Sequence, residues 1–381
     1  MAAKWVKMVI CTLVLLLCTG CWDSVDLDSR SLFTSYIVDK TDNGYAFYVE
    51  IATITSNLVN PAQEQQQGQK PTIIRSEGAT FTEARADLDR IVAKPLFLGA
   101  NQALLFTERM ARSGIEEYMY RVRAMPDFRK SEDVAVLFGD PREFLDIQPQ
   151  NATTVGFAVE YSIQNDIDEG HGFHVTAEDV LEKLSSFNNK AFLMKTLAVK
   201  EGQPAIVAYA VFDGGKCLGF IPREEGRGIV YTYSRALGSR APNFDYVVPW
   251  SGGMVAVRVE LTQNDISPSY RDGKVYFDLE YHFYVEELYP WNANPVTEAA
   301  VREIKGGLKA MLEEDIWKAV NASQKDFGVD FMSFSEPFRI SYPDAYEKMD
   351  WKREFPGAKF SLKVVIDHYT CKGFTYDPYN R

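Results

Sequence analysis

The sequence predicts an α+β protein of mixed α/β character with several domains, each of them a β-sheet flanked by helices. Apolar residues make up 46% of the 381 residues, which is ample for packed cores. Helix and strand patterns alternate over residues 80–200, and strand patterns dominate beyond residue 200. A short apolar segment that ends in a cysteine stands apart at the N-terminus.

Residues 1–20 have the organisation of a secretory signal peptide. Lys4 and Lys7 form a basic start, and residues 8–18 form an apolar run broken by Thr12 alone. This run has the length of a signal-peptide core rather than that of a membrane-spanning helix. We therefore expect residues 1–20 to be removed from the mature protein.

The end of this segment resembles a bacterial lipobox. Two small residues, Thr19 and Gly20, precede Cys21, which predicts that Cys21 receives a diacylglyceryl group and becomes the mature N-terminus. The match departs at Cys18, where leucine is usual, but cysteine is also apolar and of modest size. The alternatives are an ordinary cleaved signal and an uncleaved signal anchor.

The charge of the remaining chain bears on how it is held at a membrane. Lys4 and Lys7 are the only charged residues among the first 20, so the other 361 residues carry 39 basic and 53 acidic side chains, a net charge of −14. Such a body is repelled by nucleic acid and by anionic headgroups. The composition therefore argues against nucleic-acid binding and makes the two acyl chains on Cys21 the membrane anchor.

Of the five cysteines, the two expected to remain in the mature body show no metal-ligand spacing. Cys11 and Cys18 leave with the signal peptide and Cys21 is acylated, so Cys217 and Cys371 alone remain in the body. A disulfide between these two stays open, because it requires a Cα separation below about 7 Å, which a sequence does not give. Two free thiols are the favoured interpretation.

The N-terminal part is predicted to open with a hairpin, with strands over residues 32–38 and 45–54 around Asp42-Asn43-Gly44. Residues 60–70 are polar and of low complexity, and are typical of an exposed loop. Alternating elements follow: a helix behind the capping box Thr80-Phe81-Thr82-Glu83, a strand over 103–106, a short helix from 107, a helix from the capping box Ser113-Gly114-Ile115-Glu116 to 124, a strand over 133–138, a helix from Asp140-Pro141, and a helix over 177–184.

The second half is predicted to be richer in strands. The expected elements are a hairpin of strands 205–212 and 217–221, strands over 254–261 and 275–285, an amphipathic helix from Asn294-Pro295 to about 320, and a last strand over 360–366. We therefore divide the mature chain into an N-terminal α/β domain of residues 21–200, a small β-rich middle domain of residues 201–253 and a C-terminal α/β domain of residues 254–381.

Candidate metal sites are weak. His171 and His174 offer two imidazoles, but their glycine-flanked spacing favours a polar loop. The acidic runs 286–287 and 313–315 lack the ligand spacing of a calcium loop and are predicted to be solvated faces. No metal or other cofactor is therefore expected.

Catalytic motifs are absent from the sequence as well. It contains no Gly-x-Ser-x-Gly, P-loop or dinucleotide fingerprint, and Ser251 lacks the flanks of a nucleophile elbow. With 53 acidic residues, nothing in the spacing selects a catalytic pair. The sequence therefore predicts a protein that is not an enzyme and has no catalytic residues.

Several short sequence strings occur along the chain in an order that is typical of one protein family. They are Cys21-Trp22-Asp23, Gly78, Gly114-Ile115, Ala210-Val211-Phe212, Leu218-Gly219-Phe220, the helix end Ser323-Gln324-Lys325-Asp326-Phe327-Gly328-Val329-Asp330, and Trp351. In this order, and with the lipobox, the chain resembles the Ger(x)C family, the C subunits of spore germinant receptors in endospore-forming Gram-positive bacteria. The usual acidic residue a few places after Trp-Asp is Asp26 here.

The resemblance implies three α/β domains, each built around a sheet, and no catalytic activity. It also implies a lipoprotein on the outer face of the spore inner membrane that works with two integral membrane subunits in nutrient-triggered germination. Only Cys21 carries over as a residue with a defined role. Two alternatives remain: an extracytoplasmic solute-binding lipoprotein that captures the nutrient itself, against which the β-rich second half argues, and a cell-envelope hydrolase.

Overall fold

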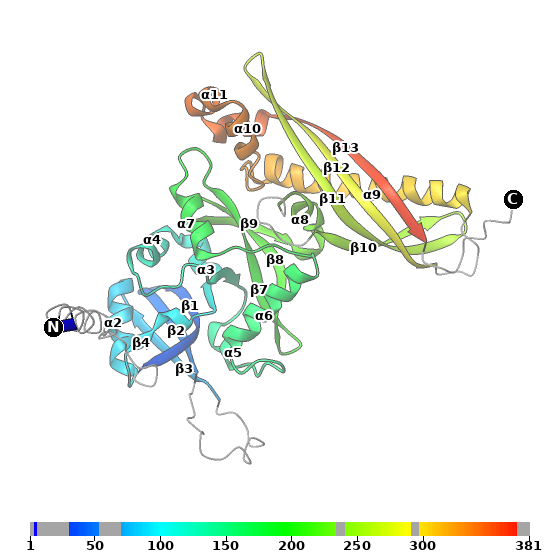
Figure 1. Cartoon of the computed structure of the whole chain (residues 1–381). Helices are drawn as coiled ribbons and strands as arrows, with labels where there is room; N and C mark the ends of the chain where they lie inside the picture. Colours follow the sequence, from blue (N-terminus) through cyan, green and yellow to red (C-terminus); the bar gives the residue numbers. More distant parts are fainter. Residues whose placement is uncertain (1–3, 6–29, 53–69, 234–240, 291–296, 372–381) are drawn as a thin grey trace.

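Two β-sheets organise the molecule. The computed structural model describes residues 4–5, 30–52, 70–233, 241–290 and 297–371. Figure 1 shows the first sheet with its helices in blue to green, and the second sheet with helix α9 in yellow to red. The predicted mixture of helices and sheets is confirmed, and the described residues form two sheets where the family resemblance implied three.

The first sheet has the strand order β3-β2-β1-β5-β6-β7-β8-β9, and the short β4 pairs with β1. Strands β1, β5, β6 and β7 run parallel to one another, and the flanking strands are antiparallel. The bounds are β1 Ser31–Thr41, β2 Gly44–Ala52, β3 Thr72–Gly78, β4 Leu96–Phe97, β5 Ala103–Thr107, β6 Asp133–Leu137, β7 Ala191–Lys200, β8 Gln203–Asp213 and β9 Lys216–Pro222.

Helices cover both faces of this sheet. Strands β5 and β6 are buried at every residue, as expected for parallel strands covered on both sides. Helices α2, α3, α4 and α7 share one apolar core with the sheet, and α5 and α6 form the other. The bounds are α2 Phe81–Ile91, α3 Glu108–Ser113, α4 Glu116–Ala124, α5 Pro141–Asp146, α6 Val155–Asp168 and α7 Ala177–Ser185.

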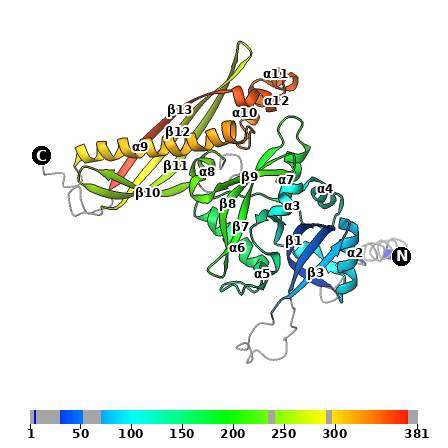
Figure 2. The same ribbon diagram turned by 180° about the vertical axis from the view of Figure 1, so that it is seen from behind.

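The second sheet is covered by a helix on one face. Its order is β10 (Asn243–Trp250), β11 (Gly253–Arg271), β12 (Lys274–Pro290) and β13 (Lys359–Cys371), with β13 parallel to β12. Helix α9 (Glu298–Asn321) lies along one face, as Figure 2 shows from behind. Its buried residues recur every three or four positions, from Ala300 to Val320, so one stripe packs against the sheet.

The two sheets are joined through a shared apolar core. Helix α8 (Arg227–Tyr233) packs between the first sheet and α9, and a Cβ at Gly228 would lie 2.1 Å from the Asp315 carbonyl oxygen. Only glycine therefore allows α8 to lie this close to α9. Three short helices, α10 (Ser335–Ser341), α11 (Pro343–Lys348) and α12 (Trp351–Glu354), connect α9 to β13.

Most of the predicted elements are confirmed. The first hairpin, the helix caps at Thr80 and Asp140, α7, β12 and the alternating last strand lie where the sequence places them. The predicted loop over residues 60–70 and the helix start at Asn294-Pro295 lie outside the described residues, apart from Lys70, and α9 itself is capped by Thr297.

Two local predictions were wrong. The Ser113 hydroxyl donates to the Met110 carbonyl at the end of α3, so Ser113 does not cap α4. Helix α6 was missed, although Thr154 caps it and apolar residues recur every four positions within it.

The first sheet continues across residue 200 through β8 and β9, so residues 201–253 contribute to both sheets. The sequence division at 200 and 253 stays a prediction.

Candidate functional site

A polar cleft lies where the two sheets meet. It has a volume of about 830 Å³ and lies between the C-terminal half of α6, the end of β7 with β8, the segment after β9 and the start of the second sheet. Its charged lining residues are four acids and four bases: Asp166, Glu169, Glu224, Asp245, Lys200, Arg223, Arg227 and Arg258. Because these charges balance, the cleft favours neither an anion nor a cation, and its polarity suits a small polar molecule.

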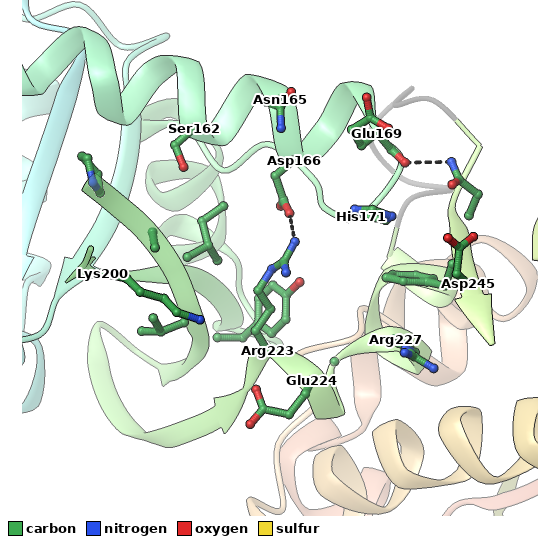
Figure 3. Close-up of a pocket in the computed structure, with 18 of the residues that line it drawn as sticks. Ser162, Asn165, Asp166, Glu169, His171, Lys200, Arg223, Glu224, Arg227 and Asp245 are labelled. Atoms are coloured by element: carbon green, nitrogen blue, oxygen red, sulfur yellow. Dashed lines mark hydrogen bonds and ion pairs between the residues drawn. The ribbon is translucent and has the colours of Figure 1, made fainter. Parts of the chain in front are cut away.

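A buried ion cluster forms one wall of the cleft. Asp166 on α6 is 5% exposed, and its Oδ1 accepts a hydrogen bond from Nη2 of Arg223 at 2.6 Å. Figure 3 shows this carboxylate pointing from α6 toward Arg223. On the other side, Nζ of Lys195 lies 3.3 Å from Oδ2 of the same carboxylate. Two cations therefore share one buried acid, and this fixes the guanidinium of Arg223 at the cleft surface.

Lys195 is unusual because it lies in the middle of a buried strand. Only 2% of the residue is exposed. Burial lowers the pKa of its ammonium group, whereas the negative charge of Asp166 acts in the opposite direction. The described lining of the cleft does not include Lys195, so the lysine supports Asp166 from behind.

The two candidate histidines do not come together as metal ligands. His171 stacks on Phe244 of β10 with the ring centroids 5.1 Å apart, and burial, together with the charge of Arg223, lowers its pKa. His174 instead lies with Nδ1 3.4 Å from Oδ1 of Asp133. Within the described ranges, no group of three His, Cys, Asp or Glu side chains could hold a metal ion.

The two acidic runs are less solvated than predicted. Glu287 is 4% exposed and accepts a hydrogen bond from the Tyr369 hydroxyl at 3.2 Å. Asp315 accepts one from the Tyr246 hydroxyl at 2.8 Å, and burial raises its pKa. The prediction of solvated faces was therefore wrong for these two residues, while Glu314 is exposed and pairs with Lys318.

A second junction between the sheets is centred on a buried carboxylate, Asp330. It accepts hydrogen bonds from the backbone N–H groups of Phe334 and Ser335 at 2.9 and 2.7 Å, and from Nε1 of Trp351 at 3.0 Å. Nδ2 of Asn189, which precedes β7 of the first sheet, lies 3.1 Å from the same carboxylate. Burial raises the pKa of Asp330 to about 6. This residue connects the loop before β7 to the helices of the second half.

Two models of spore germination proteins match most of the chain. Residues 23–198 match the family model described as spore germination protein N-terminal domain, and residues 208–367 match the model described as spore germination B3/GerAC like, C-terminal. The chain belongs to the Ger(x)C family of spore germination proteins.

Similar proteins span the same length. Spore germination protein B3 of Bacillus subtilis (strain 168) is 20% identical over 94% of this chain and 96% of its own length, and spore germination protein KC of the same organism is 22% identical over 93% and 92%. The crystal structure of the GerBC protein matches with a TM-score of 0.52 and 13% identity, covering 87% of this chain and 96% of that chain. The last match bears on the fold alone.

Several residues of the strings typical of the Ger(x)C family make close contacts in the structure. Asp330 and Trp351 are hydrogen-bonded to each other. A Cβ at Gly78 would lie 2.2 Å from the Ala84 backbone nitrogen, and a Cβ at Gly219 would lie 2.8 Å from the ring of Phe327. These strings therefore mark close approaches between elements rather than reactive groups.

Cys21, the predicted lipidation site, lies outside the described residues, as does almost all of the predicted signal peptide. Cys217 in β9 is a free, buried thiol, and burial raises its pKa to about 11. No helix among the described residues is long and apolar enough to span a membrane.

The ion cluster was not predicted from the sequence, because Asp166, Lys195 and Arg223 lie on three separate elements. One signal was present: Lys195 lies inside the apolar run of β7, where a lysine requires a buried partner. For Asp330, the sequence offers no comparable indication of burial. The residue only stands at the end of the string Ser323–Asp330, which is typical of the family.

Proposed function

We propose that this chain is the lipid-anchored, non-enzymatic C subunit of a nutrient germinant receptor, acting through contacts with two integral membrane subunits on the outer face of the spore inner membrane. The observation that carries the proposal is the match to germination proteins along nearly the whole chain. The matched region begins at residue 23, two residues after Cys21, so the predicted lipid anchor lies at the edge of the region shared with germination proteins.

Electrostatics supports the role of the lipid. A body with a net charge of −14 after residue 20 has no attraction for anionic headgroups. Two acyl chains supply stable anchoring at about 0.8 kcal/mol per buried CH₂. Cys21 is therefore the residue on which membrane attachment depends in this proposal.

Membrane fractionation and co-purification of the two membrane subunits test the proposal. Cys21→Ala is expected to release the chain from the membrane fraction and to impair germination. Cys18→Leu is the matched control, since it restores the residue usual at that place and is expected to leave attachment unchanged. If Cys21→Ala stays quantitatively in the membrane and supports germination, the anchor proposal fails.

A second candidate function is capture of the nutrient by this chain, and the cleft of about 830 Å³ is the observation that favours it. Calorimetry of the purified chain with amino acids and sugars tests this function. Tight binding at one site, lost in Arg223→Ala, would favour it over a role in contacts alone. The third alternative, a cell-envelope hydrolase, is favoured by no particular observation.

A further inference from the structure

The second sheet has one face that no described helix covers. Helix α9 and the short helices α8 and α10 pack on the inner face, where the buried side chains of β11 and β12 lie. Figures 1 and 2 show α9 on one side of the sheet only. We call the opposite side the bare face. It differs from the first sheet, which has helices on both faces.

Acidic residues dominate the middle of the bare face. Strand register places seven acids and five bases on the face: Asp245, Glu260, Asp265, Asp278, Glu280, Glu286, Asp367, Arg258, Lys363, Arg271, Lys274 and Lys359. Three of the bases, Arg271, Lys274 and Lys359, lie together at the end formed by the β11–β12 turn. The other two are paired with acids, because Arg258 bonds Asp245 at 2.8 Å and Lys363 bonds Glu280 at 2.6 Å. The middle of the face therefore presents a net negative charge to its surroundings.

One end of the bare face is apolar. Val247, Met254 and Tyr289 are 45%, 49% and 55% exposed. Register places them next to one another, since Val247 and Tyr289 both lie opposite Ala256, and Met254 lies opposite Pro249. The face thus has an apolar end, an acidic middle and a basic end at the β11–β12 turn, and a combination of apolar contact with charged surroundings is typical of protein interfaces.

The charge of the acidic middle indicates which kind of partner fits this face. The acidic middle would repel anionic headgroups, and a second copy related by a two-fold axis through the centre of the face would place one acidic middle against the other. A single metal ion does not fit, because Asp278 and Glu286 are eight residues apart on one strand, about 26 Å at 3.3 Å per residue. A protein surface rich in lysine and arginine matches both the charge and the extent of the acidic middle.

We propose that the bare face of the second sheet binds a basic surface of a partner protein, with an apolar side chain of that partner against Val247, Met254 and Tyr289. This inference rests on the proposed function, in which the partners are the two integral membrane subunits. It goes beyond that function because it assigns the contact to one face and states the chemistry of the partner.

Charge reversal tests the acidic part of the face in the full-length, membrane-attached chain. Glu260→Lys combined with Asp265→Lys is expected to lower recovery of the epitope-tagged membrane subunits by about tenfold or more, since like charges are then brought together at the interface. The matched control is Glu182→Lys with Glu347→Lys, which makes the same charge change at exposed positions on α7 and α11. The control is expected to recover the subunits as the wild type does.

The apolar end has its own pair of variants. Val247→Ser with Met254→Ser is expected to reduce recovery severalfold. Phe187→Ser with Ile340→Ser is the control, because these side chains are 87% and 74% exposed but lie off the bare face. Recovery by the wild type is also expected to fall as salt is raised from 0.05 to 0.5 M, because salt screens exposed charges.

The outcomes separate this inference from the proposed function. If the wild type recovers the membrane subunits and Glu260→Lys with Asp265→Lys recovers them equally well, the bare face is not the contact surface and the proposed function stands. If the wild type recovers neither subunit, both proposals fail. If the purified chain is a dimer that this pair of substitutions dissociates, the occupant is a second copy and the partner assignment is overturned.

Discussion

The two sheets of this protein differ in where their charged side chains lie. The first sheet has helices on both faces and holds its ions inside, as the Asp166–Lys195 pair shows, whereas the second has α9 on one face and displays its ions on the other. Parallel strands that are buried on both faces have continuous apolar sequences, whereas strands of a sheet with one open face alternate between apolar and polar residues. The first sheet therefore leaves little of its surface for a partner, whereas the second sheet has a large polar surface that no described helix covers.

The largest expected effect contrasts one buried acid with one exposed acid. Asp166→Ala leaves Lys195 buried without its partner and is expected to lower the free energy of unfolding by about 3–5 kcal/mol. Asp245→Ala breaks the exposed pair with Arg258 and is expected to change it by less than about 1 kcal/mol. Urea unfolding followed by circular dichroism measures both, and similar losses would break the comparison.

Two glycines sharpen the same contrast. A Cβ at Gly156 would lie 1.8 Å from the Thr34 carbonyl oxygen, so Gly156→Ala is expected to cost about 1–3 kcal/mol by forcing α6 away from β1. Gly306 in α9 has nothing within 4 Å of that position, and Gly306→Ala is expected to add about 0.5–1 kcal/mol through helix propensity. Thermal unfolding should therefore shift in opposite directions, and a shared direction would contradict the packing described.

The pH dependence of stability should reflect the interior of the first half. Burial raises the pKa of Glu132 to about 8, whereas an unfolded glutamate titrates near 4.3. The folded state therefore binds more protons between these values. The contribution of Glu132 is fully present below about pH 4.3 and is lost as the pH rises toward 8. In the wild type, the urea concentration at the unfolding midpoint should fall as the pH rises between these values. In Glu132→Gln this fall should be absent, and an unchanged pH dependence would contradict the role of Glu132.

The smallest effect belongs to the bare face. Hydrogen bonds from His282 to Asp367 and Glu280 raise the pKa of the imidazole, which is half-buried on this face. Its contribution to stability is present below about pH 6.5 and is lost as the pH rises through the folded pKa. Asp367→Asn should lower the pKa of His282 in an NMR titration, and an unchanged value would show that the pair does not form.

Local structure was predictable where one residue pattern decided it. The Asp42-Asn43-Gly44 hairpin and the alternating β13 follow from turn chemistry and strand period. Helix α6 was missed although Val155, Val159, Ile163 and Ile167 recur every four residues. The strand order of the first sheet and the Asp166 cluster depend on contacts between distant segments, about which local patterns say nothing.

The central claim is that this chain works through contact with membrane partners at the bare face. The most direct measurement places a photo-crosslinking amino acid at Glu260 in the membrane-attached chain and identifies what it captures by mass spectrometry. The account predicts a crosslink to an integral membrane subunit from Glu260 and none from the same probe at Glu182 on α7. Crosslinks from Glu182 but not from Glu260 would contradict it.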